Sequence, residues 1–277
     1  MNPPLAAVQH IRPMRGGSQS HLMRASDGAY YVVKFQNNPQ HVRVLANELI
    51  AGRLGRWLGL PLPPVEIIAV SAWLIEHSPE MRVHIASGSS PCRSGRQLAS
   101  FYGMPDFEGA LFDYLPEPSL VQVGNLADFA RMLVLDKWTA NNDGRQAIFR
   151  RAKGRRKFHV DFIDQGYCFN GGDWAFSDSA LRGVFANAAV YAGVKGWDAF
   201  EPVLSRAERA SATDLWQCAA GLPEEWYDGD RTGLERLIEQ LYRRRLIIRD
   251  LIEEFRRSTR NPFPKWDTGS ALAARVR

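Results

Sequence analysis

Cysteine is scarce in this sequence, and the long apolar runs of membrane proteins are missing. The three cysteines, Cys92, Cys168 and Cys218, are odd in number, widely spaced and without a CxxC pair. That pattern argues against a disulfide framework and against a structural zinc site. No basic start followed by an apolar run marks a signal peptide, and runs such as 65–70 are too short to span a bilayer. The sequence therefore predicts a reducing, cytoplasmic location and no membrane partner.

Charge of either sign is moderate. The 35 basic and 30 acidic residues give a net charge of +5, which suits a phosphate-bearing ligand or an acidic partner without demanding nucleic acid. A DNA-binding function would rest on the basic isoelectric point alone, so direct nucleic-acid contact is not expected. Apolar residues make up 45% of the 277 residues, enough for one large domain or for two lobes that share a cleft.

The order of the expected elements divides the chain into a strand-rich part and a helix-rich part. These elements are a strand over 29–35, a helix over 40–58 ended by prolines, paired strands over 65–70 and 71–76, a helix from 125, a polar loop over 139–146, a strand over 158–163 and a long helix over 233–257. We therefore predict an α+β fold with a strand-rich N-lobe and a helical C-lobe.

Four segments follow from this order. We predict a flexible N-terminus at 1–12, an N-lobe at 13–118, a helical C-lobe at 119–259 and a flexible tail at 260–277. The hinge between the lobes is placed, by position, at Phe112–Pro116. The polar loop and a strand that ends in an acid lie just after the change from strands to helices. A cleft between two such lobes is a common place for chemistry.

A glycine-rich segment precedes the strand over 29–35. It consists of Gly16, Gly17, Ser18, Gln19 and Ser20. Glycines let a backbone approach phosphate closely, and N–H groups with small hydroxyls can bind its oxygens. The segment is neither a GxxxxGK[ST] loop nor a GxGxxG loop. Taken alone it fits an ordinary hairpin turn better than a phosphate-binding loop.

Lys34 lies inside an apolar strand, and Glu48 follows on the next helix. A buried lysine is costly unless an anion meets it, whereas a solvent-facing strand position would need no partner. A helix packed on that strand can present Glu48 to the ammonium and aim it at phosphate oxygens. The order of glycine-rich loop, strand lysine and helix glutamate favours this arrangement.

Two acids about twenty residues apart mark the strongest candidate site. Asp143 lies in the polar loop, and Asp164 ends an apolar strand just before Gln165 and Gly166. One carboxylate could orient an acceptor hydroxyl while the other holds magnesium beside a triphosphate. Gln146 could supply a neutral oxygen ligand, and Arg145 could steady phosphate charge or the carboxylate of Asp143.

The order of these segments resembles the HipA-like kinases. The resemblance rests on the glycine-rich loop, VVK ending at Lys34, NE ending at Glu48, NNDGRQ at 141–146 and IDQG at 163–166, and covers about 12–257. It is closest to the shorter bacterial members, and more distantly similar to protein and phosphatidylinositol kinases. It implies a protein-kinase-like fold with ATP between the lobes. Lys34 would contact the phosphates, Asp143 would be the catalytic acid, and Asp164 would bind magnesium.

One part of the loop departs from the family pattern. A metal-binding Asn usually follows the catalytic Asp by five residues, in a DxHxxN pattern. Here that position is Ile148, and Arg145 replaces the His. Gln146 is the nearest substitute. The resemblance implies an ATP- and Mg²⁺-dependent kinase acting on Ser/Thr of a protein or on a small-molecule hydroxyl. The departure leaves open a kinase-shaped module, inactive or weakly active, that works with a regulatory partner.

Two basic runs remain outside the site. The run over 150–157 is expected to form an exposed hairpin between the polar loop and the acidic strand, and it could dock an acidic substrate. The arginines at 243–245 lie on the last amphipathic helix and are expected on its solvated face.

Overall fold

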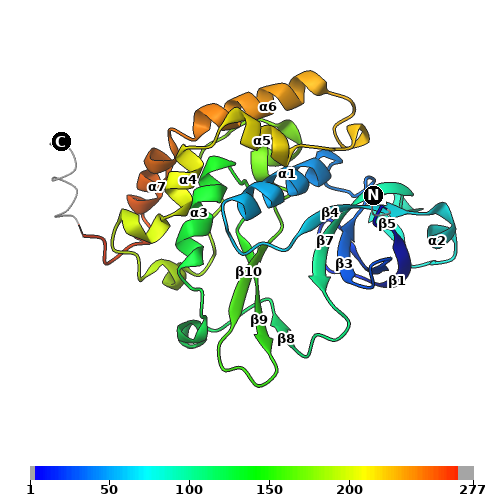
Figure 1. The fold of residues 1–277 in the computed structure, drawn as a ribbon, viewed down its shortest axis with the longest axis horizontal. Coiled ribbons are helices and arrows are strands. Elements are labelled where there is room, and N and C mark those ends of the chain that lie inside the picture. The colour runs from blue at the N-terminus through cyan, green and yellow to red at the C-terminus, as the bar shows by residue number, and fades with distance from the viewer. Residues whose placement is uncertain (1–3, 268–277) are drawn as a thin grey trace.

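Alternating apolar residues build the first sheet of the computed structural model, which describes residues 4–267 (Figure 1). Its antiparallel strands lie in the order β1-β2-β3-β7-β4. These strands are β1 (Ala7–Pro13), β2 (His21–Ala25), β3 (Tyr30–Lys34), β7 (Gly95–Gly103) and β4 (Val65–Val70). Lys34 pairs with Leu98 at the end of β3. The lysine is thereby fixed in the middle of the sheet rather than at an edge.

Both faces of this sheet are covered. Helix α1 (Arg43–Trp57) buries Leu45, Leu49 and Leu54 in a core that also holds Leu98 of β7. A second core on the other side contains residues from β2, β3 and β4. Around it lie α2 (Ala72–Glu76) and the hairpin of β5 (Arg82–Ile85) and β6 (Gly88–Pro91).

The prediction of a strand over 71–76 is wrong, because this segment forms α2. The hydroxyl of Ser71 accepts a hydrogen bond from the backbone N–H of Leu74 at 3.1 Å and so caps a short helix.

The predicted loose ends are shorter than expected. Residues 7–12 belong to β1, which pairs with β2 and buries Ala7. At the other end Phe263 is only 3% exposed and stacks on Trp266. Aromatic burial therefore anchors the chain beyond residue 260. The parts of the predicted ends at 1–3 and 268–277 lie outside the described residues.

The chain leaves the first sheet at Gly103 and joins a second one at Gly109. That sheet has the order β10-β9-β8, with β8 (Gly109–Phe112), β9 (Gln146–Ala152) and β10 (His159–Ile163). Phe112 is already paired with Phe149 of β9. The connection between the sheets is therefore 104–108, and the predicted hinge at Phe112–Pro116 lies too late in the sequence.

Helices are the main regular elements after residue 113, and they lie on one side of the second sheet, from which β8 and β9 project away (Figure 1). The α-helices are α3 (Asp128–Trp138), α4 (Val203–Glu208), α5 (Ala212–Cys218), α6 (Arg231–Arg244) and α7 (Ile248–Arg256). Short 3-10 helices are η1 (Glu117–Gln122), η2 (Cys168–Asp173), η3 (Ala188–Tyr191), η4 (Trp197–Phe200) and η5 (Glu224–Trp226).

The helix predicted over 233–257 is divided into α6 and α7. The backbone N–H groups of Leu246 and Ile247 donate to the carbonyls of the residues three positions earlier. The last turn of α6 is therefore tighter than an α-helical turn, and the helix ends there. Arg244, expected on a solvated face, is instead 8% exposed. Its guanidinium donates to both carboxylate oxygens of Asp178, at 2.9 and 2.6 Å, and lies over the ring of Phe176.

Cys92, Cys168 and Cys218 are buried, and none of them forms a disulfide in the described part of the chain. No α-helix within 4–267 has both the length and the apolar content needed to cross a membrane.

Candidate active site

Three of the predicted site residues form one cluster between the lobes. The ammonium of Lys34 donates to Glu48 Oε2 at 2.8 Å and to Asp164 Oδ1 at 2.9 Å. Lys34 is 8% exposed and Glu48 is 3% exposed. The carboxylate of Asp164 keeps more contact with solvent, with 27% of its side chain exposed. The prediction that α1 presents Glu48 to Lys34 is confirmed.

The charges of this cluster stabilise one another. Burial alone would lower the pKa of Lys34, but Glu48 and Asp164 raise that pKa above its ordinary value. Burial likewise opposes ionisation of Asp164, yet the positive charges of Lys34 and Arg145 hold its pKa below the ordinary value. At neutral pH the cluster therefore holds a lysine cation beside an aspartate anion whose side chain is partly exposed. Such a pair can bind a phosphate and a divalent cation next to each other.

The backbone at Asp164 is held in an uncommon conformation. Its φ is +62°, in the left-handed region that non-glycine residues rarely adopt. Two residues later, a Cβ on Gly166 would lie 2.5 Å from Val44 Cγ1 of α1. Only glycine allows α1 to approach this closely. The close approach brings Glu48 of α1 to the same lysine that Asp164 contacts.

Asn47, beside Glu48 on α1, ties the helix to the segment after Asp164. Its Nδ2 donates to the carbonyls of Gly166 at 2.8 Å and Gly171 at 2.7 Å. Its Oδ1 accepts from the indole N–H of Trp174 at 2.7 Å. With its side chain fully buried and all three bonds satisfied, Asn47 fixes the position of α1 relative to Asp164. The sequence hinted at this role only by a polar residue within an otherwise apolar helix face.

The loop that carries Asp143 is fastened by a buried ion pair. Arg145 pairs with Asp136 of α3, and each side chain is 1% exposed. The same guanidinium donates to the carbonyls of Ile163 at 2.8 Å and Asp164 at 3.2 Å. Arg145 thus links α3, its own loop and the end of β10. The expected role of Arg145 in steadying phosphate or Asp143 is wrong, because its charge is already used in this pair.

Asp143 and Gln146 lie on the exposed side of that loop. The Nε2 of Gln146 is 3.3 Å from Asp164 Oδ2, so the amide and the carboxylate share one site. The carboxylate of Asp143 accepts a hydrogen bond from the backbone N–H of Gly144 at 2.7 Å. Its own carbonyl accepts from the N–H of Gly183 at 3.1 Å. The loop backbone is therefore fixed while the Asp143 side chain faces solvent.

Oxygen donors at this site fit a hard cation. Asp164 supplies a carboxylate and Gln146 an amide, which are ligand types that Mg²⁺ accepts. Among residues 4–267, no three His, Cys, Asp or Glu side chains come together as a metal site.

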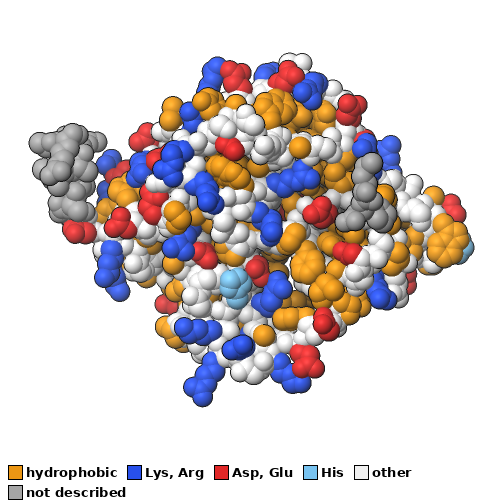
Figure 2. All heavy atoms as spheres, viewed as in Figure 1, with side chains coloured by type: hydrophobic (Ala, Val, Ile, Leu, Met, Phe, Trp, Pro, Cys, Tyr) orange, Lys and Arg blue, Asp and Glu red, His pale blue; other side chains and the backbone are white. Residues whose placement is uncertain are grey.

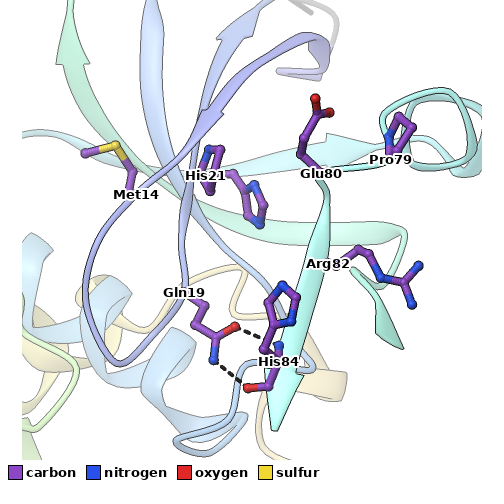
Figure 3. Close-up of a pocket in the computed structure, with 8 residues that line it drawn as sticks. Met14, Gln19, His21, Pro79, Glu80, Arg82 and His84 are labelled. Carbon is purple, nitrogen blue, oxygen red and sulfur yellow. Dashed lines mark hydrogen bonds between the residues drawn. The ribbon is translucent and has the colours of Figure 1, made fainter. Parts of the chain in front are cut away.

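The glycine-rich loop joins β1 to β2 and is tied to β5 through Gln19 (Figure 3). The Nε2 of Gln19 donates to the carbonyl of His84 at 2.6 Å, and its Oε1 accepts from the His84 N–H at 2.7 Å. The two bonds extend the β5 backbone pairing onto the loop. Figure 3 shows them closing one side of a cavity of about 550 Å³. In the loop, Gly16 and Gly17 are exposed while Ser18 and Ser20 are buried.

Removing this tie should weaken nucleotide binding. In Gln19→Ala the loop loses two hydrogen bonds, each contributing about 1 kcal/mol, and must be ordered when a phosphate binds. We expect the Kd for ATP to rise roughly fivefold, measured by calorimetry. His84→Ala is the matched control, because only its backbone takes part and its affinity should be unchanged. Equal weakening in both variants would show that the tie does not position the loop.

Apolar residues that the sequence reasoning left unassigned flank the cluster. Val32 lies two residues before Lys34, on the same face of β3, and pairs with Leu22 and Ser100. On β9, Ile148 lies two residues after Gln146, and Ile163 of β10 pairs with Gln146. Val32, Ile148 and Ile163 are half-buried. In the sequence, such positions could have been found by counting every second residue along the strand from Lys34 and from Gln146, because these share one face.

The chain is similar to known kinases in sequence and in fold. The family model described as HipA-like kinase matches residues 8–153, more than half of the chain. The curated proteins contain no match. Three solved kinase-fold structures are similar at 11 to 13% identity, which shows a shared protein-kinase-like fold.

These structures are matched over most of the chain. Hydra Fam20 with sugar has a TM-score of 0.57 at 11% identity, over 92% of this chain and 88% of that one. The Golgi casein kinase with Mn/ADP bound has a TM-score of 0.53 at 13% identity, over 91% of this chain and 74% of that one. The Helicobacter pylori proinflammatory kinase CtkA has a TM-score of 0.50 at 12% identity, over 88% of this chain and 99% of that one. The predicted bilobal α+β kinase fold is confirmed, and the chain belongs to the HipA-like kinase family.

Proposed function

We propose that this chain is an ATP- and Mg²⁺-dependent phosphotransferase that acts on a Ser or Thr hydroxyl of a protein. The observation that carries the proposal is the buried Lys34 held between Glu48 and Asp164. A lysine with only a structural role would not need two carboxylates, because removing a second carboxylate from water costs free energy. Around a phosphate-binding lysine they fix its position and keep it charged.

Each residue has a distinct role in this proposal. Lys34, oriented by Glu48, donates to phosphate oxygens, and the exposed backbone N–H groups of Gly16 and Gly17 would bind other oxygens of the same phosphates. The nucleobase fits between the apolar faces of Val32 and Ile148. Asp143 accepts the proton of the attacking hydroxyl.

Asp164 and Gln146 would hold Mg²⁺, which when bound neutralises charge on the transferred group. The family pattern places an Asn at the position of Ile148, but that residue is part of β9 and pairs with Asp161. Gln146, two residues earlier, is the amide that contacts Asp164. The proposal therefore assigns the missing amide to Gln146. This contact favours an active enzyme over an inactive kinase-shaped module, which is the second candidate function, alongside a small-molecule kinase.

The test is ATP consumption by the purified protein with and without Mg²⁺. We expect Mg²⁺-dependent turnover that falls by about 10²- to 10⁴-fold in Asp143→Asn. That variant should still bind ATP with unchanged Kd, because Asp143 acts on the acceptor. Neither turnover nor thermal stabilisation by ATP in the unaltered protein would remove the enzyme proposal and leave the binding module. The cytoplasmic location remains a proposal, tested by fractionation of the source cells.

A further inference from the structure

The positive charge of this chain is concentrated in one hairpin. Residues 150–157 between β9 and β10 contain six Arg or Lys residues and no acidic residue, whereas the whole chain has a net charge of +5. Figure 2 shows basic side chains gathered over the part of this face where Figure 1 places β8, β9 and β10. The hairpin forms as the sequence predicts, with Arg150 paired to His159 across the strands. One projecting element therefore carries the surplus charge.

A cavity of about 470 Å³ lies at the base of this hairpin. We call it the hairpin pocket. It is lined on one side by apolar residues of the segment before β4 and of β7, and on the other by basic residues. Its lining is Leu62, Pro63, Pro64 and Phe101 on the apolar side, and Arg56, Arg150, Ala152, Arg155, Lys157, His159 and Asp161 on the polar side. The pocket thus offers an apolar wall facing a basic wall.

Internal partners account for only part of the basic wall. Arg150 donates to Asp161 Oδ2 at 3.1 and 2.8 Å, and both residues line the pocket. Outside the pocket, Lys153 pairs with Glu108, and Arg151 lies over the ring of Phe158. Within the described part of the chain, Arg155 and Lys157 have no carboxylate at ion-pair distance, and both are exposed. Two cations at the rim of a pocket are therefore available to an anionic ligand.

We propose that the hairpin pocket docks an acidic segment, containing an apolar side chain, of the protein that this enzyme phosphorylates. Carboxylates of that segment pair with Arg155 and Lys157, and its apolar side chain packs on Pro64 and Phe101. The proposal rests on the proposed kinase function. It names the class of acceptor, which the catalytic residues leave open.

Charge and shape favour a protein segment over nucleic acid. A sugar–phosphate backbone has no group that gains from contact with the apolar wall, whereas an apolar side chain of a peptide can pack against it. Nucleic-acid surfaces extend basic residues along a stripe, because phosphates repeat at regular spacing. Here Arg155 and Lys157, which have no ion-pair partner among residues 4–267, lie in one hairpin at the edge of a pocket. Mixed apolar and charged contacts are the usual composition of a peptide-binding groove.

The position of the pocket connects docking with the active site. Asp161 lines the pocket and lies on β10, three residues before Asp164, which follows the last residue of the strand; at the rise of a β-strand this is about 10 Å. Arg150 lies on the strand that begins with Gln146. A segment held here is tethered next to the cleft, and tethering raises the effective concentration of an acceptor hydroxyl.

The test is binding of a fluorescein-labelled twelve-residue peptide of Glu and Asp with two Leu residues, followed by anisotropy in about 100 mM salt. We expect saturable binding that weakens by at least about tenfold in Arg155→Glu or Lys157→Glu. Arg156→Glu is the matched control, since Arg156 lies between them in the same turn but does not line the pocket. Its affinity should stay within about twofold. Replacing both Leu residues of the peptide by Ser should also weaken binding.

Several results would overturn the proposal. Equal loss in Arg156→Glu and Arg155→Glu would mean diffuse attraction rather than a pocket. Stronger binding of a twelve-nucleotide thymidine strand would assign the hairpin to nucleic acid, and no binding of the peptide would leave no docking site. Because the assay needs no turnover, Asp164→Asn should bind the peptide like the unaltered chain. If the unaltered chain bound the peptide but consumed no ATP, the kinase function alone would be contradicted.

Discussion

Asp164→Asn should reduce Mg²⁺-dependent ATP turnover by about 10³-fold, the size of loss seen when one preorganised electrostatic group is removed. The substitution keeps the size of the side chain but removes the charge that contacts Lys34 and lies beside Gln146. Both the proposed metal contact and the electrostatic partner of the lysine are then lost. The measurement is steady-state turnover at saturating ATP over a range of Mg²⁺ concentrations.

The matched control for this variant is Asp161→Asn. Asp161 lies on β10, three residues before Asp164, and pairs with Arg150 away from the cluster. Its turnover should stay within about threefold of the unaltered chain. If Asp164→Asn retained more than a tenth of the activity, the assignment of Asp164 as the metal carboxylate would be wrong.

Arg145→Met should destabilise the fold by about 3–5 kcal/mol, because it leaves the buried carboxylate of Asp136 without its counter-charge. The variant also frees the carbonyls of Ile163 and Asp164 that Arg145 now satisfies. Such a loss is a large share of the roughly 5–15 kcal/mol that stabilises a typical domain. Urea unfolding followed by tryptophan fluorescence measures it.

A double variant separates the ion pair from other effects of the substitution. Asp136→Leu combined with Arg145→Met removes both charges, and we expect it to be more stable than Arg145→Met alone. Lys153→Met, which breaks an exposed pair with Glu108, should change stability by less than about 0.5 kcal/mol. A loss no larger in Arg145→Met than in Lys153→Met would contradict the role given to Arg145.

Local patterns in the sequence were sufficient to identify the cluster. Lys34 stood out because a charged residue in an apolar strand needs a partner, and Glu48 because it followed on the next helix. Asp164 was recognisable as an acid that ends a strand before a glycine. The structure joins these three by direct contacts.

Features that depend on distant segments could not be predicted in this way. Arg145 pairs with Asp136, nine residues earlier on α3, and with backbone eighteen residues later. Either partner is invisible until α3, β9 and β10 are packed together. The role of Gln19 likewise depends on β5, sixty-five residues away. The α2 helix was missed because a single capping serine outweighed the strand-like composition of 71–76.

A crystal structure with Mg²⁺ and a non-hydrolysable ATP analogue tests the central claim most directly. We expect the metal to be bound by oxygens of Asp164 and Gln146, with Lys34 Nζ at hydrogen-bond distance from a phosphate oxygen. The adenine should lie between Val32 and Ile148. A nucleotide bound elsewhere, or a metal that touches neither Asp164 nor Gln146, would contradict the account.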